Sequence, residues 1–496
     1  MKRISSIVMA AGLGKRMRSK KAKVLHPVAG RPMIWYMALM AHRVSDGNVV
    51  VVVGHQGEQV KAFLDQEKKS LEPFDTVVQT EQFGTGHAVK QAKALLLPKG
   101  KLVSELCLIL NGDTPLLTQT TIEQLIAQHR DTQAVVTILS TELENPHGYG
   151  RVMRQANGQV FKIVEDEDAT SEEKATKEVN VGTYVVSSAF LFKSLDELKS
   201  NNVQDEYYLT DILGLAVAHN LRVGVMKTAD SVECFGINSR EHLVFAEQVM
   251  RNRIRSYWLQ AGVTMLDPKT TLIDDGVEIG QDTVLYPGVT IEGETKIGSE
   301  TIVRSHSRLT NSVIGDEVVI EDHSILDGAL VEDQAKIGPF ARLRLGAIVR
   351  TKAKVGNFVE LKNVELGAEA KASHLSYLGD ATIGKKVNIG AGTITCNYDG
   401  YKKERTVIED GVFIGSDCQL VAPVTIGEGA VIAAGETVTK DVPADALTFS
   451  RAEQVNHEGW AARRRAWYEN EPGKTPEKSR TKAKMQNVKG STKKSQ

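Results

Sequence analysis

Aliphatic residues recur every six positions from residue 277 to about residue 442. The first run holds Ile279, Leu285, Ile291, Ile297, Val303 and Leu309. Positions six apart lie on nearly opposite faces of an α-helix, so a helix cannot bury this stripe. An antiparallel meander would show a two-residue alternation broken by irregular turns. The period of six predicts a β-helix, in which each hexad forms one face of a prism and the aliphatic side chains stack inward.

The same count continues after Leu309, with a slip of register. It resumes at Val313, Val319, Ile325, Val331, Ile337, Leu343, Val349, Val355 and Leu361, then at Ile383 and Ile389, and finally at Ile408, Ile414, Leu420, Ile426, Ile432 and Val438. Glycine often follows the aliphatic residue, which suits a tight corner where a Cβ would crowd the turn. The pattern resembles the left-handed hexapeptide-repeat β-helix of acyltransferases, and that resemblance implies the hand.

The N-terminal half alternates short apolar runs with helical patterns. Residues 4–11, 49–53 and 106–110 are predicted strands, and residues 34–43, 87–96 and 120–129 are predicted helices. This alternation predicts a doubly wound, Rossmann-like parallel sheet. Ligands of such sheets bind at the carboxyl ends of the strands, so the loops after residues 11 and 110 should face one crevice.

Composition places the chain among ordinary globular proteins. It has 496 residues, a net charge of −1 and four cysteines without a C-x-x-C pair. These features predict neither a disulfide framework nor a cysteine zinc site, and they give no field that attracts nucleic acid or membrane. No apolar stretch is long enough to span a bilayer. We therefore expect a soluble, cytoplasmic protein that binds neither nucleic acid nor membrane.

A glycine-rich loop with two cations follows the first predicted strand. Gly12 and Gly14 allow backbone N–H groups to approach a phosphate, and Arg16 and Lys23 come close behind. The loop is not a dinucleotide fingerprint, because Met17 stands at its sixth position, and it lacks the spacing of a Walker A loop. The arrangement suits stabilisation of a transferring phosphoryl group.

Several segments together resemble sugar-1-phosphate nucleotidyltransferases. Residues 10–17 with Lys23 resemble the signature of that family, residues 79–88 resemble the base- and sugar-binding segment of its uridylyltransferase branch, and residues 111–113 match its metal-binding segment. Residues 148–151, 163–165, 180–182 and 236–238 also match in order and spacing. With the predicted β-helix, residues 4–465 resemble the bifunctional bacterial N-acetylglucosamine-1-phosphate uridylyltransferase/glucosamine-1-phosphate acetyltransferases.

The resemblance implies four parts of the chain. We expect a uridylyltransferase (pyrophosphorylase) domain at 1–238, a helical arm at 239–262, a left-handed β-helix acetyltransferase domain at 263–465 and a disordered basic tail at 466–496. Residues 239–261 contain no glycine or proline and carry apolar residues at helical spacing, which independently predicts the arm. The tail is a solubilising segment or, alternatively, a contact for nucleic acid or acidic surfaces.

The resemblance also assigns the uridylyltransfer residues. Asp113 and Asn238 are implied to hold Mg²⁺, and Arg16 and Lys23 to hold the triphosphate of UTP and act in catalysis. The residues implied to bind UTP or UDP-N-acetylglucosamine are Met9, Ala10, Ala11, Gly12, Lys23, Gln79, Gly84, Thr85, Asn111, Gly112, Asp113, Gly150, Glu165, Asn180 and Asn238. Ala22 and Asn111 depart from the proline and tyrosine that are commoner in the family.

Two interruptions of the sixfold count mark a second candidate site. Residues 372–380 include His374, the side-chain type that accepts a proton from an amine near neutral pH, and residues 390–405 form an extruded loop. By resemblance His374 is the general base of acetyl transfer. Arg344, Lys362, Tyr377 and Asn388 would bind the sugar phosphate, and Ala391, Asn397, Tyr398, Ser416, Ala434 and Arg451 would bind acetyl-CoA. Leu345 stands where proline is common.

The implied enzyme acetylates glucosamine-1-phosphate with acetyl-CoA and then transfers UMP from UTP to the product, releasing pyrophosphate. The UDP-N-acetylglucosamine supplies peptidoglycan and lipopolysaccharide precursors. The resemblance further implies a homotrimer with acetyltransfer sites shared between subunits. Two alternatives remain: a nucleotidyltransferase whose β-helix only oligomerises or regulates, and a regulatory subunit with a degenerate transferase fold.

Overall fold

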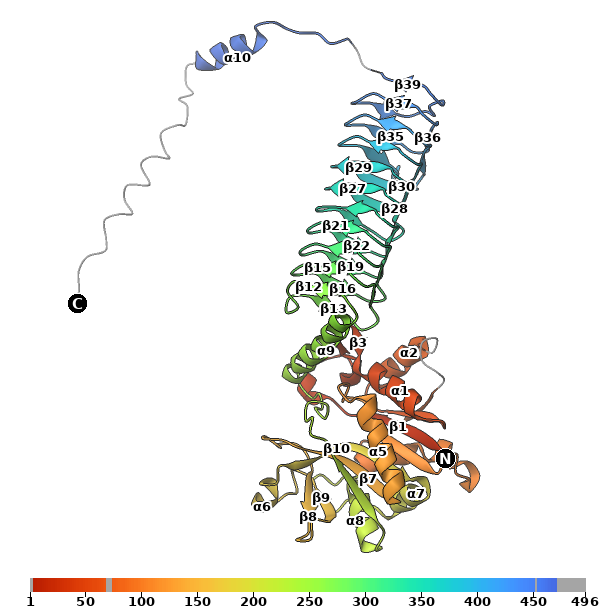
Figure 1. The fold of residues 1–496 in the computed structure, drawn as a ribbon, viewed down its shortest axis with the longest axis vertical. Helices are drawn as coiled ribbons and strands as arrows, with labels where there is room; N and C mark the ends of the chain where they lie inside the picture. Colours follow the sequence, from red (N-terminus) through yellow and green to blue (C-terminus); the bar gives the residue numbers. More distant parts are fainter. Residues whose placement is uncertain (1–2, 68–73, 451–452, 471–496) are drawn as a thin grey trace, which may run out of the picture. The chain divides into compact units, whose positions relative to one another are not determined.

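The computed structural model describes residues 3–67, 74–450 and 453–470, and these residues form two compact units that divide after residue 448. The N-terminal half of the first unit holds a nine-stranded sheet with the order β11-β7-β10-β6-β1-β4-β5 (Figure 1). Its strands are β1 (Ile4–Ala10), β4 (Val49–Val53), β5 (Asp75–Val78), β6 (Leu106–Asn111), β7 (Val136–Glu142), β10 (Glu178–Ser187) and β11 (Val223–Lys227). Strand β8 (Arg151–Arg154) pairs with β10, and β9 (Val160–Val164) pairs with β8.

The sheet is parallel around its centre and mixed beyond it. Strand β1 pairs in parallel with both β4 and β6, as predicted. Strand β10 runs antiparallel to both β6 and β7, a reversal that the strand–helix alternation did not predict. The central strands end together, with Ala10 opposite Val53 and Met9 opposite Asn111. Their following loops therefore share one edge of the sheet.

Helices cover both faces of this sheet, which explains the run of valines in β4. Val49, Val51 and Val53 pack in one apolar cluster with α1 (Met33–Val44), α2 (Gly57–Gln66) and α5 (Gln119–Thr132). Val50 and Val52 pack in another with α3 (Thr85–Gln91), α7 (Ser188–Glu197) and α8 (Asp211–Ala218). The shorter helices are α4 (Lys93–Leu96) and α6 (Ser171–Lys174). A strand buried on both sides has no polar face, so its sequence does not alternate.

The predicted helix after residue 238 is α9 (Arg240–Gln260). Ser239 caps it, because its side chain accepts a hydrogen bond from the His242 N–H. Ala246 and Met250 are buried in an apolar cluster with Val28 and Leu116, and Ile254 packs against both that cluster and the core of the β-helix. Helix α9 thus joins the two hydrophobic cores.

Residues 264–448 form a parallel β-helix with three faces (Figure 1). The first face holds β12 (Thr264–Met265), β15 (Val284–Leu285), β18 (Ile302–Val303), β21 (Val319–Ile320), β24 (Lys336–Ile337), β27 (Lys354–Asn357), β29 (Lys371–His374), β31 (Asn388–Ile389), β34 (Phe413–Ile414), β37 (Val431–Ile432) and β39 (Leu447–Thr448). The second face holds β13 (Leu272–Ile273), β16 (Thr290–Glu292), β19 (Arg308–Thr310), β22 (Ile325–Asp327), β25 (Arg342–Leu343), β32 (Ile394–Cys396), β35 (Gln419–Val421) and β38 (Thr437–Val438).

The third face is joined to the second by two longer strands. It holds β14 (Glu278–Ile279), β17 (Lys296–Ile297), β20 (Val313–Ile314), β23 (Leu330–Val331), β26 (Ile348–Val349), β33 (Thr406–Ile408) and β36 (Val424–Ile426). Strands β28 (Glu360–Leu366) and β30 (Tyr377–Ile383) extend over both faces. One residue per short strand points inward, and these residues form one continuous core.

The predicted register is wrong in the stretch after Leu309. Ile314, Ile320 and Leu326 are the buried residues there, and the predicted Val313 and Ile325 are 46% and 47% exposed. Two shortened corners cause the difference, one at Asn311 and one at Gly328, and both residues have positive φ. The prediction placed a single slip of register between Leu309 and Val313. The sequence alone does not show which of two adjacent aliphatic residues points inward, because Val313, Val319 and Ile325 are each followed by a second aliphatic residue.

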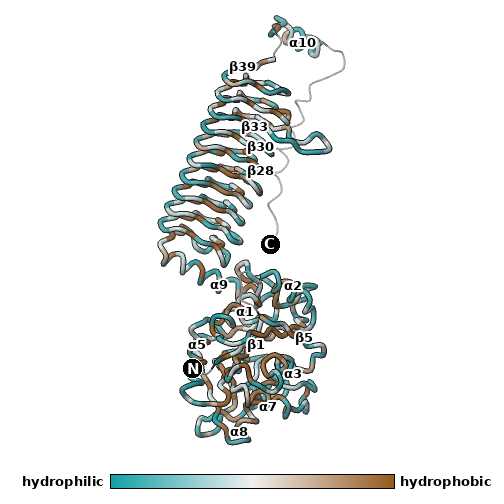
Figure 2. Tube along the Cα trace, turned by 90° about the vertical axis from the view of Figure 1, so that its right-hand side faces the viewer, coloured by the Kyte–Doolittle hydropathy of each residue, from teal (hydrophilic) through white to brown (hydrophobic). Residues whose placement is uncertain are grey.

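The predicted interruption between Leu361 and Ile383 is also wrong. The coils continue through this stretch, with Leu366, Ala372 and Leu378 buried at the inward positions. The interruption after Ile389 is confirmed: a loop leaves the coil between β32 and β33 and is closed by a bridge between Tyr398 and Lys403. Figure 2 shows this loop standing out from the coils beside β33.

The second unit contains helix α10 (Trp460–Glu469). This helix crosses the expected boundary at residue 465, and residues 471–496 of the expected tail lie outside the described residues. Among the residues that are described, none of the helices has the length and apolarity needed to cross a bilayer.

Candidate active sites

Two adjoining cavities open at the edge of the sheet where β1 and β6 end. The first, of about 330 Å³, is lined by Met9, Ala10, Ala11, Gly12, Lys23, Gln79, Gly84, Thr85, Asn111 and Asp113 among the predicted nucleotide residues. The second, of about 180 Å³, is lined by the predicted Gly150, Glu165, Asn180 and Asn238. Met9, Thr85, Asn111 and Asp113 line both cavities, so the two form one cleft.

Lys23 joins three distant parts of the chain at the centre of this cleft. It stands on the short 3-10 helix Lys23–Leu25, and its ammonium donates hydrogen bonds to the Asp113 carboxylate and, over 3.1 Å, to Oδ1 of Asn238. Gly14 has φ +59°, and a Cβ there would lie 2.8 Å from Cβ of Lys23. Position 14 must therefore be glycine for the Lys23 side chain to lie directly against the loop.

Arg16 lies outside both cavities. It is exposed on the 3-10 helix Lys15–Met17. Burial raises the pKa of the Tyr149 hydroxyl, which lines the second cavity, and Arg16 is close enough to oppose that shift. The guanidinium is therefore near the mouth of the cleft but does not form its wall.

Residues 79–88, the predicted base- and sugar-binding segment, are held against residues 206–209. The buried Gln79 amide donates to the Gly84 carbonyl over 3.1 Å. Gly84 has φ +97°, and a Cβ there would lie 2.7 Å from the Tyr207 carbonyl. The Thr85 hydroxyl accepts a hydrogen bond from the Leu209 N–H over 3.0 Å. Residues 206–209 were not predicted as part of the site. Only their contacts with Gly84 and Thr85 in the folded chain identify them.

The second cavity has amide and carboxylate groups that suit a sugar. The Asn180 amide donates to the Tyr184 hydroxyl over 2.8 Å, and its oxygen accepts from the Gly182 N–H over 3.2 Å. The Glu165 carboxylate accepts from the Thr210 hydroxyl over 2.9 Å. Burial, and then the nearby carboxylates of Asp211, Asp168 and Glu206, raise the pKa of Glu165.

Asn111, one of the three departures from the family pattern, has a specific place in this cleft. Its amide donates to the Val181 carbonyl over 3.2 Å. A Cβ on Gly182, which has φ +80°, would collide with that same amide nitrogen. Asn111 therefore links β6 to the irregular stretch of β10 that begins at Asn180, a residue of the second cavity.

Asp113 and Asn238 fit a divalent cation. Their carboxylate and amide oxygens both contact the Lys23 ammonium, so they converge on one positively charged group. Within the described ranges, no group of three or more His, Cys, Asp or Glu side chains could hold a metal. A pair of hard oxygens suits Mg²⁺, which keeps several waters and takes further oxygens from phosphates.

The second predicted site lies on a corner of the β-helix. His374 ends strand β29, opposite Asn357 of β27, and its Nδ1 lies 2.7 Å from Oδ1 of Asn357. An amide oxygen at this position requires a proton on Nδ1, which leaves Nε2 as a base. The imidazole is exposed, so a substrate can reach it.

Three predicted acetyl-CoA residues continue the same corner on successive coils. The Leu375 carbonyl accepts from the Gly392 N–H, the Ala391 carbonyl from the Asp417 N–H, and the Ser416 carbonyl from the Gly435 N–H, at distances of 3.0, 2.7 and 2.7 Å. Ala391, Ser416 and Ala434 therefore form a stepped ridge that begins beside His374. Arg451, the last predicted acetyl-CoA residue, lies outside the described residues.

Positive charge gathers on the second face beside this corner. Arg344 forms an ion pair with Glu360 at 2.9 Å. The pKa of Lys362 is lowered by Lys403 first and then by Arg344, so these three cations lie close together. Lys403 comes from the extruded loop and was not predicted as a site residue. Such a group of cations is expected to bind a phosphate.

The predicted loop residues Asn397 and Tyr398 differ in their roles. The buried Asn397 amide donates to the Asp380 carboxylate, which also accepts from Asn363 over 2.6 Å. Tyr398 is 61% exposed, and its hydroxyl donates to the Gly400 carbonyl over 2.6 Å. Asn397 thus fixes the base of the loop, whereas the Tyr398 ring stays exposed.

The predicted sugar-phosphate residues stand on two different faces. Asn388 is on β31 of the first face, between Lys371 and Phe413. Tyr377 is on β30 of the second face, between Glu360 and Ile394. The corner that carries His374 separates the two faces.

The fold and these two sites define a nucleotidyltransferase joined to a hexapeptide-repeat transferase. Family comparison agrees: residues 5–263 match the nucleotidyl transferase family, residues 268–366 match the GMPPB C-terminal domain, and residues 405–439 match six repeats of the bacterial transferase hexapeptide.

Similar proteins identify the family within this class. The chain is 47% identical to the bifunctional protein GlmU of Geotalea daltonii, covering 93% of this chain and 99% of that protein. It is 46% identical to GlmU of Trichlorobacter lovleyi, over 93% and 98% of the two chains, and 46% identical to GlmU of Fervidobacterium nodosum, over 94% and 98%. The chain belongs to the GlmU family. It is a bifunctional enzyme of UDP-N-acetylglucosamine biosynthesis, with a uridylyltransferase domain and a left-handed β-helix acetyltransferase domain.

Proposed function

We propose that the N-terminal cleft binds UTP in its first cavity and N-acetylglucosamine-1-phosphate in its second. The observation that carries this assignment is that the predicted nucleotide residues and the predicted sugar residues line two cavities that share Asp113. The reacting α-phosphorus then lies where the two cavities meet, next to Lys23 and the candidate metal oxygens.

The chemistry at this point requires positioning more than proton transfer. The sugar phosphate oxygen that attacks the α-phosphorus is already an anion, so no general base is needed. The site must hold two repelling anions in line and spread the charge. Lys23 supplies one positive charge inside the cleft, and Arg16 supplies another at its mouth. Asp113 and Asn238 would hold Mg²⁺, which would supply further positive charge to the phosphates.

At the corner of the β-helix, His374 is proposed as the general base of acetyl transfer. Nε2 removes the proton from the amino group of glucosamine-1-phosphate, while Asn357 holds Nδ1–H. Arg344 and Lys362 hold the phosphate, together with Lys403. Acetyl-CoA follows the ridge of Ala391, Ser416 and Ala434 beyond His374. Arg451 stays a prediction for this cofactor.

We propose a homotrimer with acetyltransfer sites between neighbouring chains. Tyr377 and Asn388 stand on different faces, on either side of the corner that carries His374, and one face from each of two chains would form a complete sugar-phosphate site. Parallel packing of β-helices would bring the second face of one chain to the first face of the next.

The cellular assignment follows from the substrates and the thiols. UTP and acetyl-CoA are cytoplasmic metabolites, and Cys107, Cys234, Cys396 and Cys418 are all free thiols, which suits a reducing compartment. We propose a cytoplasmic enzyme that supplies peptidoglycan and lipopolysaccharide precursors. The four expected parts of the chain, at 1–238, 239–262, 263–465 and 466–496, stay a prediction.

One assay tests the proposal as a whole. Purified protein is given glucosamine-1-phosphate, acetyl-CoA, UTP and Mg²⁺, and UDP-N-acetylglucosamine is measured by mass spectrometry. Product is expected only when all four are present. A parallel assay supplies N-acetylglucosamine-1-phosphate, UTP and Mg²⁺ directly. Pyrophosphate release there, without CoA release in the first assay, would instead favour a nucleotidyltransferase with a structural β-helix, and neither release would favour a regulatory subunit.

A further inference from the structure

A short hairpin connects Lys23 to the base of the β-helix. It consists of β2 (Pro27–Val28) and β3 (Arg31–Pro32) and begins directly after the 3-10 helix that carries Lys23. Its tip is Ala29-Gly30. Ala29 is fully buried and has φ +46°, a left-handed conformation that a residue with a Cβ adopts only when its surroundings impose it.

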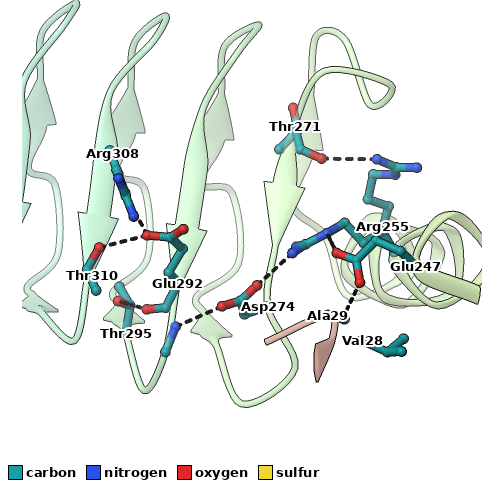
Figure 3. Close-up of polar contacts among 12 residues, drawn as sticks. Val28, Ala29, Glu247, Arg255, Thr271, Asp274, Glu292, Thr295, Arg308 and Thr310 are labelled. Carbon is teal, nitrogen blue, oxygen red and sulfur yellow. Dashed lines mark hydrogen bonds and ion pairs between the residues drawn. The ribbon is translucent and has the colours of Figure 1, made fainter. Parts of the chain in front are cut away.

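Two different elements hold this tip. The Ala29 N–H donates to the Glu247 carboxylate of helix α9 over 2.6 Å. The Ala29 carbonyl accepts from the Asp275 N–H, on the first coil of the β-helix, over 2.8 Å. Figure 3 shows Ala29, Glu247 and Asp274 together at this junction. Both backbone groups of the strained residue are thus satisfied by elements distant in sequence.

Asp274 closes the contact between the helix and the coil. It is 8% exposed; one of its oxygens accepts from Arg251 of α9 over 2.8 Å, and the other accepts from the Gly293 N–H over 3.2 Å. Arg251 in turn donates to Glu247 over 2.6 Å. A Cβ on Gly30 would lie 2.5 Å from Cγ of Asp274, so the hairpin tip packs directly on this carboxylate.

A second pair of contacts holds the side of the hairpin. Arg31 forms an ion pair with Glu294 of the second coil, and its guanidinium lies 4.9 Å from the centre of the Trp35 ring. The Val28 carbonyl accepts from the Tyr36 hydroxyl over 2.8 Å.

The same hairpin packs against the residues beside Asp113 and Asn238. Val28 and Ala29 share one buried cluster with Leu116 and Ile237. The Ile237 N–H donates to the Asp113 carbonyl over 2.9 Å. Lys23, Asp113 and Asn238 therefore come from chain segments that all lie against this hairpin, and the first coil of the β-helix holds the hairpin in place.

We propose that Asp274, on the first coil of the β-helix, is a positioning residue for uridylyl transfer. Together with Glu247 and Arg251 it holds the Ala29-Gly30 tip, and the tip holds Lys23 in line with Asp113 and Asn238. The base of the β-helix then positions a residue of the uridylyltransferase site, in addition to beginning the acetyltransferase domain. This inference rests on the proposed role of Lys23.

The test compares Asp274→Asn and Glu247→Gln with the parent enzyme. Each substitution keeps the shape of the side chain and removes its charge, so the tip is held less firmly. We expect kcat of uridylyl transfer to fall about tenfold, equivalent to about 1.4 kcal/mol of barrier. KM for N-acetylglucosamine-1-phosphate should change less than about twofold, because the sugar cavity is untouched. The acetyltransfer rate should not change.

Glu332→Gln is the matched control on a later coil. Glu332 also binds an arginine, Arg350, at 2.6 Å and a backbone N–H, that of Thr351, at 2.9 Å, but it lies away from the hairpin. It should leave both reactions unchanged.

Three results would decide against the inference or its basis. Full uridylyltransfer in both Asp274→Asn and Glu247→Gln, with loss of that activity in Lys23→Ala, would overturn the positioning role alone. An active Lys23→Ala would overturn the proposed function of Lys23. Equal loss of both reactions with a lowered Tm would show that Asp274 only stabilises the fold.

Discussion

At the scale of single residues, the pairing of His374 with Asn357 controls which ring nitrogen is the base. The 2.7 Å contact between Nδ1 and the amide oxygen selects the tautomer with Nε2 free. We expect His374→Ala to lower the acetyltransfer rate by about 10²- to 10⁴-fold. Asn357→Ala should lower it by about 10- to 100-fold, because the ring loses its orientation.

The measurement is CoA release from acetyl-CoA and glucosamine-1-phosphate. Pyrophosphate formation by the same variants from UTP and added N-acetylglucosamine-1-phosphate is the internal control, and it should stay at the parent rate. Parallel loss of both reactions in His374→Ala would contradict separate sites.

Asp113 belongs to the other reaction. Its carboxylate supplies the only full negative charge of the proposed metal pair, so Asp113→Ala should abolish uridylyl transfer and leave acetyl transfer intact. Pyrophosphate release is measured across a Mg²⁺ titration. Unchanged uridylyl transfer in this variant would remove Asp113 from the proposed metal site.

Glu165 should make sugar binding depend on pH. Its pKa is raised by burial and by neighbouring carboxylates, so it takes up a proton at a higher pH than an ordinary glutamate. As pH falls through that raised pKa, the cavity loses a carboxylate acceptor. KM for N-acetylglucosamine-1-phosphate should therefore rise toward acidic pH. The ratio of this KM to that of Glu165→Gln, measured from pH 5 to 8, tests the assignment, and a constant ratio would contradict it.

At the scale of the elements, the β-helix tolerates exposed aliphatic residues beside buried ones. Ile314 is 2% exposed, and its neighbour Val313 is 46% exposed. Ile314→Ala should lower the free energy of unfolding by about 2–5 kcal/mol. Val313→Ala should change it by less than about 1 kcal/mol. Urea denaturation of both variants is the measurement, and the reverse order would restore the register that the sixfold count predicts.

The parallel pairing explains how a coil can have one residue fewer at a corner. Such a corner shifts every later inward residue by one position relative to a strict count of six. Lys296 pairs with Val313, 17 residues on, whereas Thr290 pairs with Arg308, 18 residues on. A coil can lose one corner residue without losing its ladder of hydrogen bonds, because the strands on either side keep their partners. The extruded loop after β32 uses the same tolerance in the opposite direction and brings Lys403 beside Lys362.

At the scale of the whole molecule, the proposed trimer predicts complementation between inactive chains. Asn388→Ala damages the first face, and Lys362→Ala damages the second. Each variant alone should lose most acetyl transfer. When the two are co-expressed in equal amounts, about a quarter of the sites should combine two intact faces if chains mix at random.

The measurement is acetyltransferase activity of the co-purified mixture, with the separately purified variants mixed just before the assay as the control. Activity of the co-expressed sample no greater than that of the separate variants would contradict shared sites. Sedimentation should give about three times the chain mass of 54.2 kDa.

The sequence by itself determined the class of fold, because a stack of coils needs an inward aliphatic residue at each face and nothing else repeats at that spacing. It also pointed to the loops at the strand ends, since those loops must carry ligands in a doubly wound sheet. Nearly all predicted nucleotide and sugar residues line the cleft for this reason.

Only the tertiary structure decided which of two adjacent aliphatic residues is buried, that β10 runs antiparallel, and that the coils continue past Leu361. It also decided that Lys23 meets Asp113 and Asn238, which lie 90 and 215 residues away. Residues 206–209, Lys403 and the Ala29-Gly30 clamp became visible in the same way. These features depend on pairings between segments distant along the chain, and local periodicity carries no information about such pairings.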